Sequence, residues 1–261
     1  MTNFIKRITY YFFPPKIIGL TRIRNEQLII QDTLDHMSKH VDAIIVYDDA
    51  STDKTAEICQ KHNKVLKIIR NSKWRDSHRE VEETVSRQIL LEEGLKYHPT
   101  WFLYFDADER FEGNIKKFLY SKLSRNINGI RIKLFDAYLT NNDQSPYISG
   151  QLYNFRKYFG PEYRDILMIW KNKPHVKFTG LDSREPIVSK KIINKFYCQH
   201  YGKSLSTEHW EETCQYYIQY FPAYSAKWQD RRGKSIHTMS DFKSPLFSWK
   251  SVKKRCIPMP G

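Results

Sequence analysis

The stretch from Ala43 to Thr55, AIIVYDDASTDKT, joins an unbroken apolar run to an acidic turn and then to helix-capping residues. Such an apolar run is typical of a strand that is covered on both faces of a parallel sheet. The Ser and Thr residues that follow the turn are good N-cap residues, so they predict a helix at 54–62. The stretch therefore predicts a strand, a turn and a helix in the order that α/β proteins use.

The same alternation continues on both sides of this stretch. The apolar patterns predict strands at 16–21, 65–69 and 101–105 and helices at 28–41 and 79–97. Four strands alternating with three helices imply βαβ units with right-handed crossovers, and hence an α/β sheet. The second half is less regular, with predicted strands at 129–139, 166–171, 176–179 and 195–200 and a predicted helix at 207–220.

Composition limits the class of protein. A chain of 261 residues with 40% hydrophobic and 15% aromatic residues forms a sizeable core and is not disordered. The net charge of +14 favours anionic partners, among them nucleic acid, anionic lipid and phosphorylated substrates. No cysteine pair has CxxC spacing and no apolar run approaches a membrane span. We therefore expect buried free thiols in a cytoplasmic protein, with peripheral contact to an anionic membrane as an open alternative.

Carboxylates directly follow two of the predicted strands. Asp106 and Asp108 stand one residue apart on a turn, where both can face a Mg²⁺ or Mn²⁺ ion that keeps positions for phosphate oxygens. Asp48 and Asp49 end the strand at 43–47, where a carboxylate can accept hydrogen bonds from a base or a ribose. Ligands of open α/β sheets bind at the carboxyl ends of strands, so these turns predict a ligand site. The alternative for each pair is a solvated or helix-capping turn.

A third segment, TRIRNE at 21–26, also follows a predicted strand. Its Arg22 or Arg24 can hold a diphosphate through charge-assisted hydrogen bonds. Glu26 has the alternative role of a first-turn residue in the next helix.

Together, TRIRNE (21–26), VYDDASTDKT (46–55) and YFDADER (104–110) resemble the family 2 glycosyltransferases in content, order and spacing. The DADE form is similar to the branch that contains lipopolysaccharide-core glucosyltransferases. The resemblance covers 16–111 and implies the GT-A fold, a Rossmann-like mixed sheet flanked by helices. It also implies a nucleotide-sugar donor, usually a UDP-sugar, a Mn²⁺ or Mg²⁺ ion, and hexosyltransferase-type transfer with inversion to a glycan, lipid-linked or protein acceptor.

The resemblance also implies roles for individual residues. Those expected to bind the nucleotide-sugar are Thr21, Arg22, Asn25, Glu26, Asp48, Asp49, Arg87 and Asp106. Asp106 and Asp108 match the metal motif, and His200 is a further candidate ligand or diphosphate contact with a structural role as its alternative. For Arg87 the alternative is an exposed helix residue.

The second half matches the family more loosely. Glu185 is the first candidate for the general base and Asp182 the second, because an acceptor hydroxyl must lose its proton as it attacks. A surface ion pair with Lys190 or Lys191 is the alternative for either carboxylate. His175 is a weaker candidate than His200.

The simplest organisation is one domain at 16–225, with a nucleotide-sugar half at 16–111 and an acceptor-side half at 112–225. An N-terminal segment at 1–15 precedes it and a basic extension at 226–261 follows it. Two rivals remain. A nucleotidyltransferase typically has a glycine- and basic-rich loop after its first strand, which GLTR at 19–22 lacks. A non-catalytic protein on the same scaffold that binds nucleic acid or an anionic glycan explains the charge but not the carboxylates at two strand ends.

Overall fold

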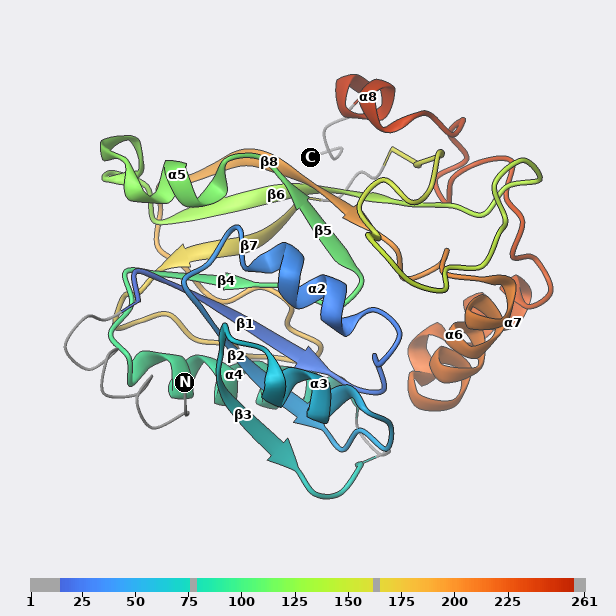
Figure 1. Ribbon diagram of the computed structural model, residues 1–261. Helices are drawn as coiled ribbons and strands as arrows, with labels where there is room; N and C mark the ends of the chain where they lie inside the picture. The colour runs from blue at the N-terminus through green and yellow to red at the C-terminus, as the bar shows by residue number, and fades with distance from the viewer. Residues whose placement is uncertain (1–14, 76–78, 162–164, 256–261) are drawn as a thin grey trace.

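A computed structural model describes residues 15–75, 79–161 and 165–255. These residues form an eight-stranded sheet in the order β3-β2-β1-β4-β7-β6-β8-β5 (Figure 1). The strands are β1 (Ile17–Ile23), β2 (Ala43–Asp49), β3 (Val65–Asn71), β4 (Trp101–Tyr104), β5 (Glu109–Glu112), β6 (Gly129–Asp136), β7 (Asp165–Lys171) and β8 (Ile192–His200). The parts of the predicted terminal segments at 1–14 and 256–261 lie outside the described residues.

The first half of the sheet is parallel, as the strand-helix alternation predicts. Strand β1 pairs with β2 and β4, and β2 pairs with β3. The connecting helices are α2 (Ile30–Met37), α3 (Thr55–Lys61) and α4 (Arg79–Leu95). Strand β2 runs beyond its apolar stretch, because Asp48 and Asp49 pair in register with Arg70 and Asn71 of β3. The carboxylates that the sequence places on a turn therefore begin within the sheet.

The second half makes the sheet mixed, which agrees with the GT-A fold. Strand β7 is antiparallel to both β4 and β6, while β8 is parallel to β6 and antiparallel to β5. Strand β5 is absent from the predicted elements, since its four residues directly follow the acidic turn. The strand predicted at 176–179 is wrong: Lys177 makes one isolated bridge to Ile187, and the Phe178 N–H donates to the side chain of Gln88.

Two hydrophobic clusters cover the two faces of the sheet. Because alternate side chains of a strand point to opposite faces, Ile17 and Ile44 belong to one cluster and Ile18 and Ile45 to the other. Helix α2 covers the first face and α4 covers the second (Figure 1). This burial on both faces is the physical reason for the unbroken apolar runs in β1, β2 and β4.

Helices α6 (Thr207–Tyr220) and α7 (Pro222–Arg231) pack together at one end of the sheet (Figure 1). Ser206 caps α6 by accepting a hydrogen bond from the His209 N–H. The remaining helical segments are α5 (Ile115–Tyr120), α8 (Trp249–Val252), η1 (Lys122–Ser124) and η2 (Lys253–Arg255). In the described part of the chain, no helix is long and apolar enough to cross a membrane.

Residues beyond the predicted boundary at 226 pack on the same core. Helix α7 crosses that boundary, Phe247 pairs with Phe159, and Val252 is fully buried in the main cluster. The division into 16–225 and 226–261 stays a prediction. Of the four cysteines, Cys59, Cys198 and Cys214 are buried free thiols, and Cys256 lies outside the described residues.

The Val252→Ala substitution tests whether the C-terminal region stabilises the domain. We expect a loss of about 2 kcal/mol of unfolding free energy, because two methyl groups leave a fully buried site. Urea unfolding followed by circular dichroism measures the change, with Lys250→Ala on the exposed side of the same helix as the control. Equal stability of the two variants would show that this region contributes little.

Candidate active site

A cavity of about 920 Å³ lies at the carboxyl ends of β1 and β4, beside the turn formed by Asp106, Ala107 and Asp108, here named the DAD turn. The predicted site residues in its lining are Arg22, Asn25, Glu26, Arg87, Asp106, Asp108, Asp182, Glu185 and His200. The other predicted residues, Thr21, Asp48 and Asp49, are buried and do not belong to the lining. His175 is exposed and also lies outside the lining. Residues far apart in the sequence therefore meet around one space.

The sheet register explains how His200 reaches the DAD turn. In the pairing of β5 with β8, Glu109 lies opposite His200, and in the pairing of β6 with β8, Asp136 lies opposite His200. The His200 Nε2 atom is 3.2 Å from the Asp108 carboxylate, and its Nδ1 atom is 2.5 Å from the Asp136 carboxylate. The imidazole is thus held between two carboxylates, one in the turn and one in the sheet.

The charges around the turn shift several pKa values. Burial and repulsion from Asp108 and Asp106 raise the pKa of Glu26 to about 8. Burial also raises the pKa of Glu109. Burial alone would raise the pKa of Asp108, but the neighbouring His200 brings it down to about 2. Burial would lower the pKa of His200, yet its two carboxylate partners raise it to about 10. The turn therefore has more carboxylates than the nearby cations neutralise.

This donor set fits a hard divalent cation. Carboxylate oxygens and an imidazole suit Mn²⁺ or Mg²⁺, and a carboxylate behind a histidine, as Asp136 lies behind His200, is a common way to orient a metal-binding ring. Among the described residues, no three His, Cys, Asp or Glu side chains are gathered closely enough to hold a metal ion as they stand. Asp106, Asp108 and His200 fit the metal by their chemistry and by the cavity that they share.

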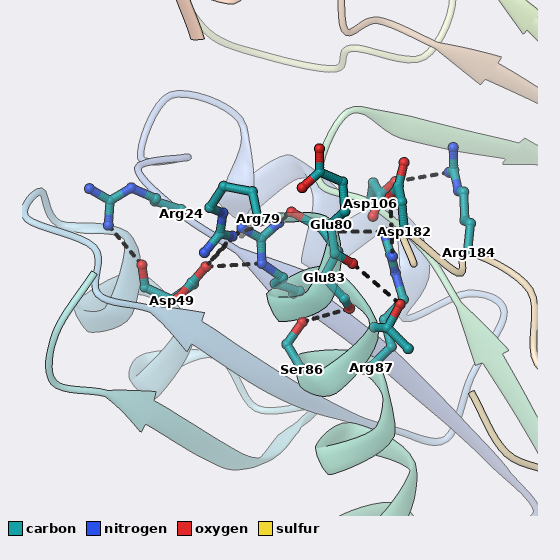
Figure 2. A network of polar contacts seen from close by, with 12 residues as sticks. Arg24, Asp49, Arg79, Glu80, Glu83, Ser86, Arg87, Asp106, Asp182 and Arg184 are labelled. Carbon is teal, nitrogen blue, oxygen red and sulfur yellow. Dashed lines mark hydrogen bonds and ion pairs between the residues drawn. The ribbon is translucent and has the colours of Figure 1, made fainter. Parts of the chain in front are cut away.

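Arg22, Glu83 and Arg87 of the cavity lining belong to a network of arginine–carboxylate ion pairs, part of which Figure 2 shows. Glu83 of α4 is 2.7 Å from Arg22, 3.1 Å from Arg87 and 3.4 Å from Arg79. Asp49 at the end of β2 is 2.8 Å from both Arg22 and Arg79. Positions 79, 83 and 87 lie on one face of α4 because they are four residues apart. The network ties β1, β2 and α4 together, and it makes Arg87 a buried residue rather than the exposed helix residue of the alternative.

The two aspartates of β2 have different surroundings. Asp48 is fully buried, and its oxygens accept hydrogen bonds from the Ser51 N–H and the Arg70 side chain. These contacts match the turn-capping alternative. Burial would raise the pKa of Asp49, but Arg22 lowers it below its usual range. Asp49 is therefore ionised at neutral pH, and its partner Arg22 lines the cavity.

The TRIRNE segment is attached to the turn after β2. The Asn25 side chain accepts a hydrogen bond from the Thr52 N–H, and the Glu26 N–H donates to the Thr55 hydroxyl. Arg24 stacks on the ring of Trp74, with its guanidinium carbon 3.7 Å from the ring centre. Asn25 has a positive φ of 53°, which lets its side chain reach the neighbouring loop. These contacts join the TRIRNE segment, which supplies lining residues, to the turn after β2, which supplies none.

The two base candidates differ in availability. Both Glu185 oxygens accept hydrogen bonds from the Arg131 guanidinium, at 2.7 and 2.6 Å. Its ion pair is therefore with a residue of β6, where the sequence suggested Lys190 or Lys191. The Asp182 carboxylate is about equally exposed, but its contact with Arg87 is longer, at 3.8 Å. Burial raises the pKa of Asp182 above the ordinary value.

The family model described as glycosyl transferase family 2 matches residues 21–159, more than half of the chain. The chain belongs to this family. Two uncharacterized proteins, from Mycobacterium bovis and Mycobacterium tuberculosis, are each 30% identical to it over 106 residues. The match covers 38% of this chain and 25% of each relative, so the chain aligns with about a quarter of their length.

Two solved structures resemble this chain weakly. Glucosyl-3-phosphoglycerate synthase from Mycobacterium tuberculosis, solved with Mn²⁺, UDP and glucosyl-3-phosphoglycerate, is 18% identical over 47% of this chain and 44% of its own, with a TM-score of 0.28. Mannose-1-phosphate geranyltransferase from Thermus thermophilus is 8% identical over 94% of this chain and 69% of its own, with a TM-score of 0.33. The assignment to the family depends on the match of the family model to residues 21–159.

The family match favours a glycosyltransferase over both the nucleotidyltransferase and the non-catalytic alternative. Several residues of the cavity were missed from the sequence. They are Asp136, Arg184, Lys203, Asp241 and the aromatic side chains of α6 and α7. The spacing of positions 79, 83 and 87 on one helix was a usable signal for the buried network. No local signal connects Asp136 to His200, since 64 residues separate them.

The Glu83→Gln substitution tests the buried network. It removes one of the two carboxylates that neutralise Arg22, Arg79 and Arg87, and leaving buried charge unpaired costs about 3–5 kcal/mol. We expect the melting temperature to fall by about 10 °C in differential scanning calorimetry. Glu80→Gln makes the same charge change on the same helix and serves as the control. Similar melting temperatures would show that the three arginines do not depend on Glu83.

Proposed function

We propose that this glycosyltransferase transfers a hexose from a UDP-sugar to an acceptor hydroxyl with inversion, using Mn²⁺ or Mg²⁺. The observation that carries the proposal is the sheet register that brings His200 against Asp108 in the cavity that Arg22 and Arg87 also line. Metal ligands and phosphate-binding cations are thus available in one space. The DADE motif supports a place among enzymes similar to the lipopolysaccharide-core glucosyltransferases, and so a role in glycan biosynthesis.

The residues divide by chemistry along the cavity. Asp106, Asp108 and His200 would hold the metal, which when bound offsets negative charge on the departing diphosphate. Arg22 supplies a cation at the diphosphate, and Thr21, Asn25 and Glu26 shape the strand end beside it. Asp49 is buried behind Arg22 and outside the cavity lining, so its part in nucleotide binding would be to hold Arg22 in position.

Asp182 is the better candidate for the general base, which reverses the order expected from the sequence. Glu185 gives both oxygens to Arg131, whereas Asp182 has a longer contact with its arginine and its raised pKa makes it a stronger base. Asp182 takes the proton of the acceptor hydroxyl while that oxygen bonds to the anomeric carbon. The bond from the anomeric carbon to the diphosphate oxygen breaks in the same displacement, which inverts the centre.

The cavity also suits an acceptor that combines a sugar ring with negative charge. Its lining includes the aromatic side chains of Tyr217 and Trp228 and the basic side chains of Lys203, Lys227 and Arg231. Aromatic faces stack on apolar ring surfaces, and the basic groups suit a phosphate or carboxylate. A glycan, lipid-linked or protein-linked acceptor of this kind agrees with the net charge of +14, and so does contact with an anionic membrane.

Thermal unfolding with nucleotides and nucleotide-sugars, each with Mn²⁺ and with EDTA, tests the donor site. UDP at a hundred times its dissociation constant stabilises the protein by about 2.7 kcal/mol if the site binds it. We expect a UDP-specific, metal-dependent rise in melting temperature of about 5–10 °C. Asp106→Asn and Asp108→Asn should lose that rise. No shift with any nucleotide in the wild type would overturn the proposal.

Comparison of Asp182→Asn with Glu185→Gln identifies the base. We expect Asp182→Asn to lower kcat by about 10²–10⁴-fold, because no group then takes the acceptor proton. The base works only when ionised, and its pKa is raised, so wild-type kcat should fall as pH drops through that pKa. This acid limb should be absent from the residual activity of Asp182→Asn. A larger loss of kcat in Glu185→Gln would instead make Glu185 the base.

A further inference from the structure

Arg184 lies directly against the DAD turn (Figure 2). Its Nη2 atom is 2.9 Å from an Asp106 oxygen and also contacts the Glu109 carboxylate. The side chain is four-fifths buried within the cavity lining, and its Nε atom is buried with no hydrogen-bond partner. One guanidinium thus neutralises part of the acidic turn while keeping an unused donor.

The backbone that carries Arg184 is anchored independently of this contact. The Asp182 N–H donates to the Glu80 carbonyl at 2.7 Å, and the Ser183 N–H donates to the Thr84 hydroxyl at 2.9 Å. Both acceptors belong to α4. Arg184 can therefore change partners by rotation of its side chain, without movement of the loop.

The contact with Asp106 conflicts with metal binding there. A guanidinium and a divalent cation compete for the same carboxylate oxygens, because each needs their lone pairs. A nucleoside diphosphate in the cavity offers other oxygens with the fork geometry that arginine prefers. The buried Nε donor would gain a partner in that exchange, which removes the cost of an unsatisfied polar group.

We propose that Arg184 is a tethered cation that occupies the DAD turn in the free enzyme and transfers to the diphosphate of the donor when the metal binds. The proposal rests on the donor site described under the proposed function. It makes Arg184 a competitor of the metal and a ligand of the nucleotide at the same time. A purely structural arginine would not have these two opposite effects.

Two binding measurements on Arg184→Gln test the proposal. Electron paramagnetic resonance of free Mn²⁺, without nucleotide, should show about tenfold tighter Mn²⁺ binding, because the competing charge is gone. Isothermal titration calorimetry with UDP at saturating Mn²⁺ should show about tenfold weaker UDP binding, because a charge-assisted contact is lost. Arg184→Lys keeps the charge but loses the forked guanidinium. Its dissociation constants for Mn²⁺ and for UDP should therefore each fall between those of the wild type and Arg184→Gln.

Arg131→Gln is the matched control. Arg131 contacts Glu185, the neighbour of Arg184 in the sequence, and does not contact the DAD turn. It should leave the Mn²⁺ constant unchanged. Weaker Mn²⁺ binding in Arg184→Gln, or unchanged constants in both Arg184 variants, would overturn the proposal while leaving the donor site intact. If Arg184→Gln does not fold, the same comparison is made with Arg184→Lys. Failure of the wild type to bind UDP with Mn²⁺ would instead overturn the proposed function, and this inference with it.

Discussion

The buried ion pairs of Asp49 and Glu83 with Arg22, Arg79 and Arg87 hold the active-site end of this molecule together. Charges of either sign are costly in the interior unless opposite charges meet them at close range. Asp49 of β2 and Glu83 of α4 both pair with Arg22 of β1 and Arg79 of α4. These shared pairs fix the ends of β1 and β2 relative to α4. Arg87 extends the same connection to the loop that carries the candidate base.

A second constraint comes from the sheet itself. The DAD turn leads without a spacer into β5, and β5 pairs with β8. Hydrogen bonding in that ladder fixes His200 beside Glu109, while the neighbouring ladder fixes Asp136 on its other side. The histidine is placed by backbone pairing, and its orientation is then set by the two carboxylates. Strand β8, which is antiparallel to β5 and parallel to β6, thereby brings His200 to the candidate site that begins in the parallel half.

Charge is distributed unevenly around the cavity. Acidic groups gather at the turn, where burial and repulsion raise the pKa values of Glu26 and Glu109. Basic groups of the second half, such as Lys203 and Arg231, form pairs with Asp136 and Asp241 close by. The net charge of the chain alone does not reveal this division.

The sequence by itself determined the parallel α/β half and the family. Its apolar runs predict the strands, and the aspartates that follow them, among them Asp49 and Asp106, belong to the motifs of the family. It also supplied many of the residues that line the cavity. Strand β5 was missed because four residues hold too little pattern, and the strand at 176–179 was wrong because its hydrophobic side chains pack from a loop. Only the tertiary structure decided the partners of His200, Arg184 and Glu185. Their contacts join strands and loops far apart in sequence, and long-range pairing leaves no local periodicity to read.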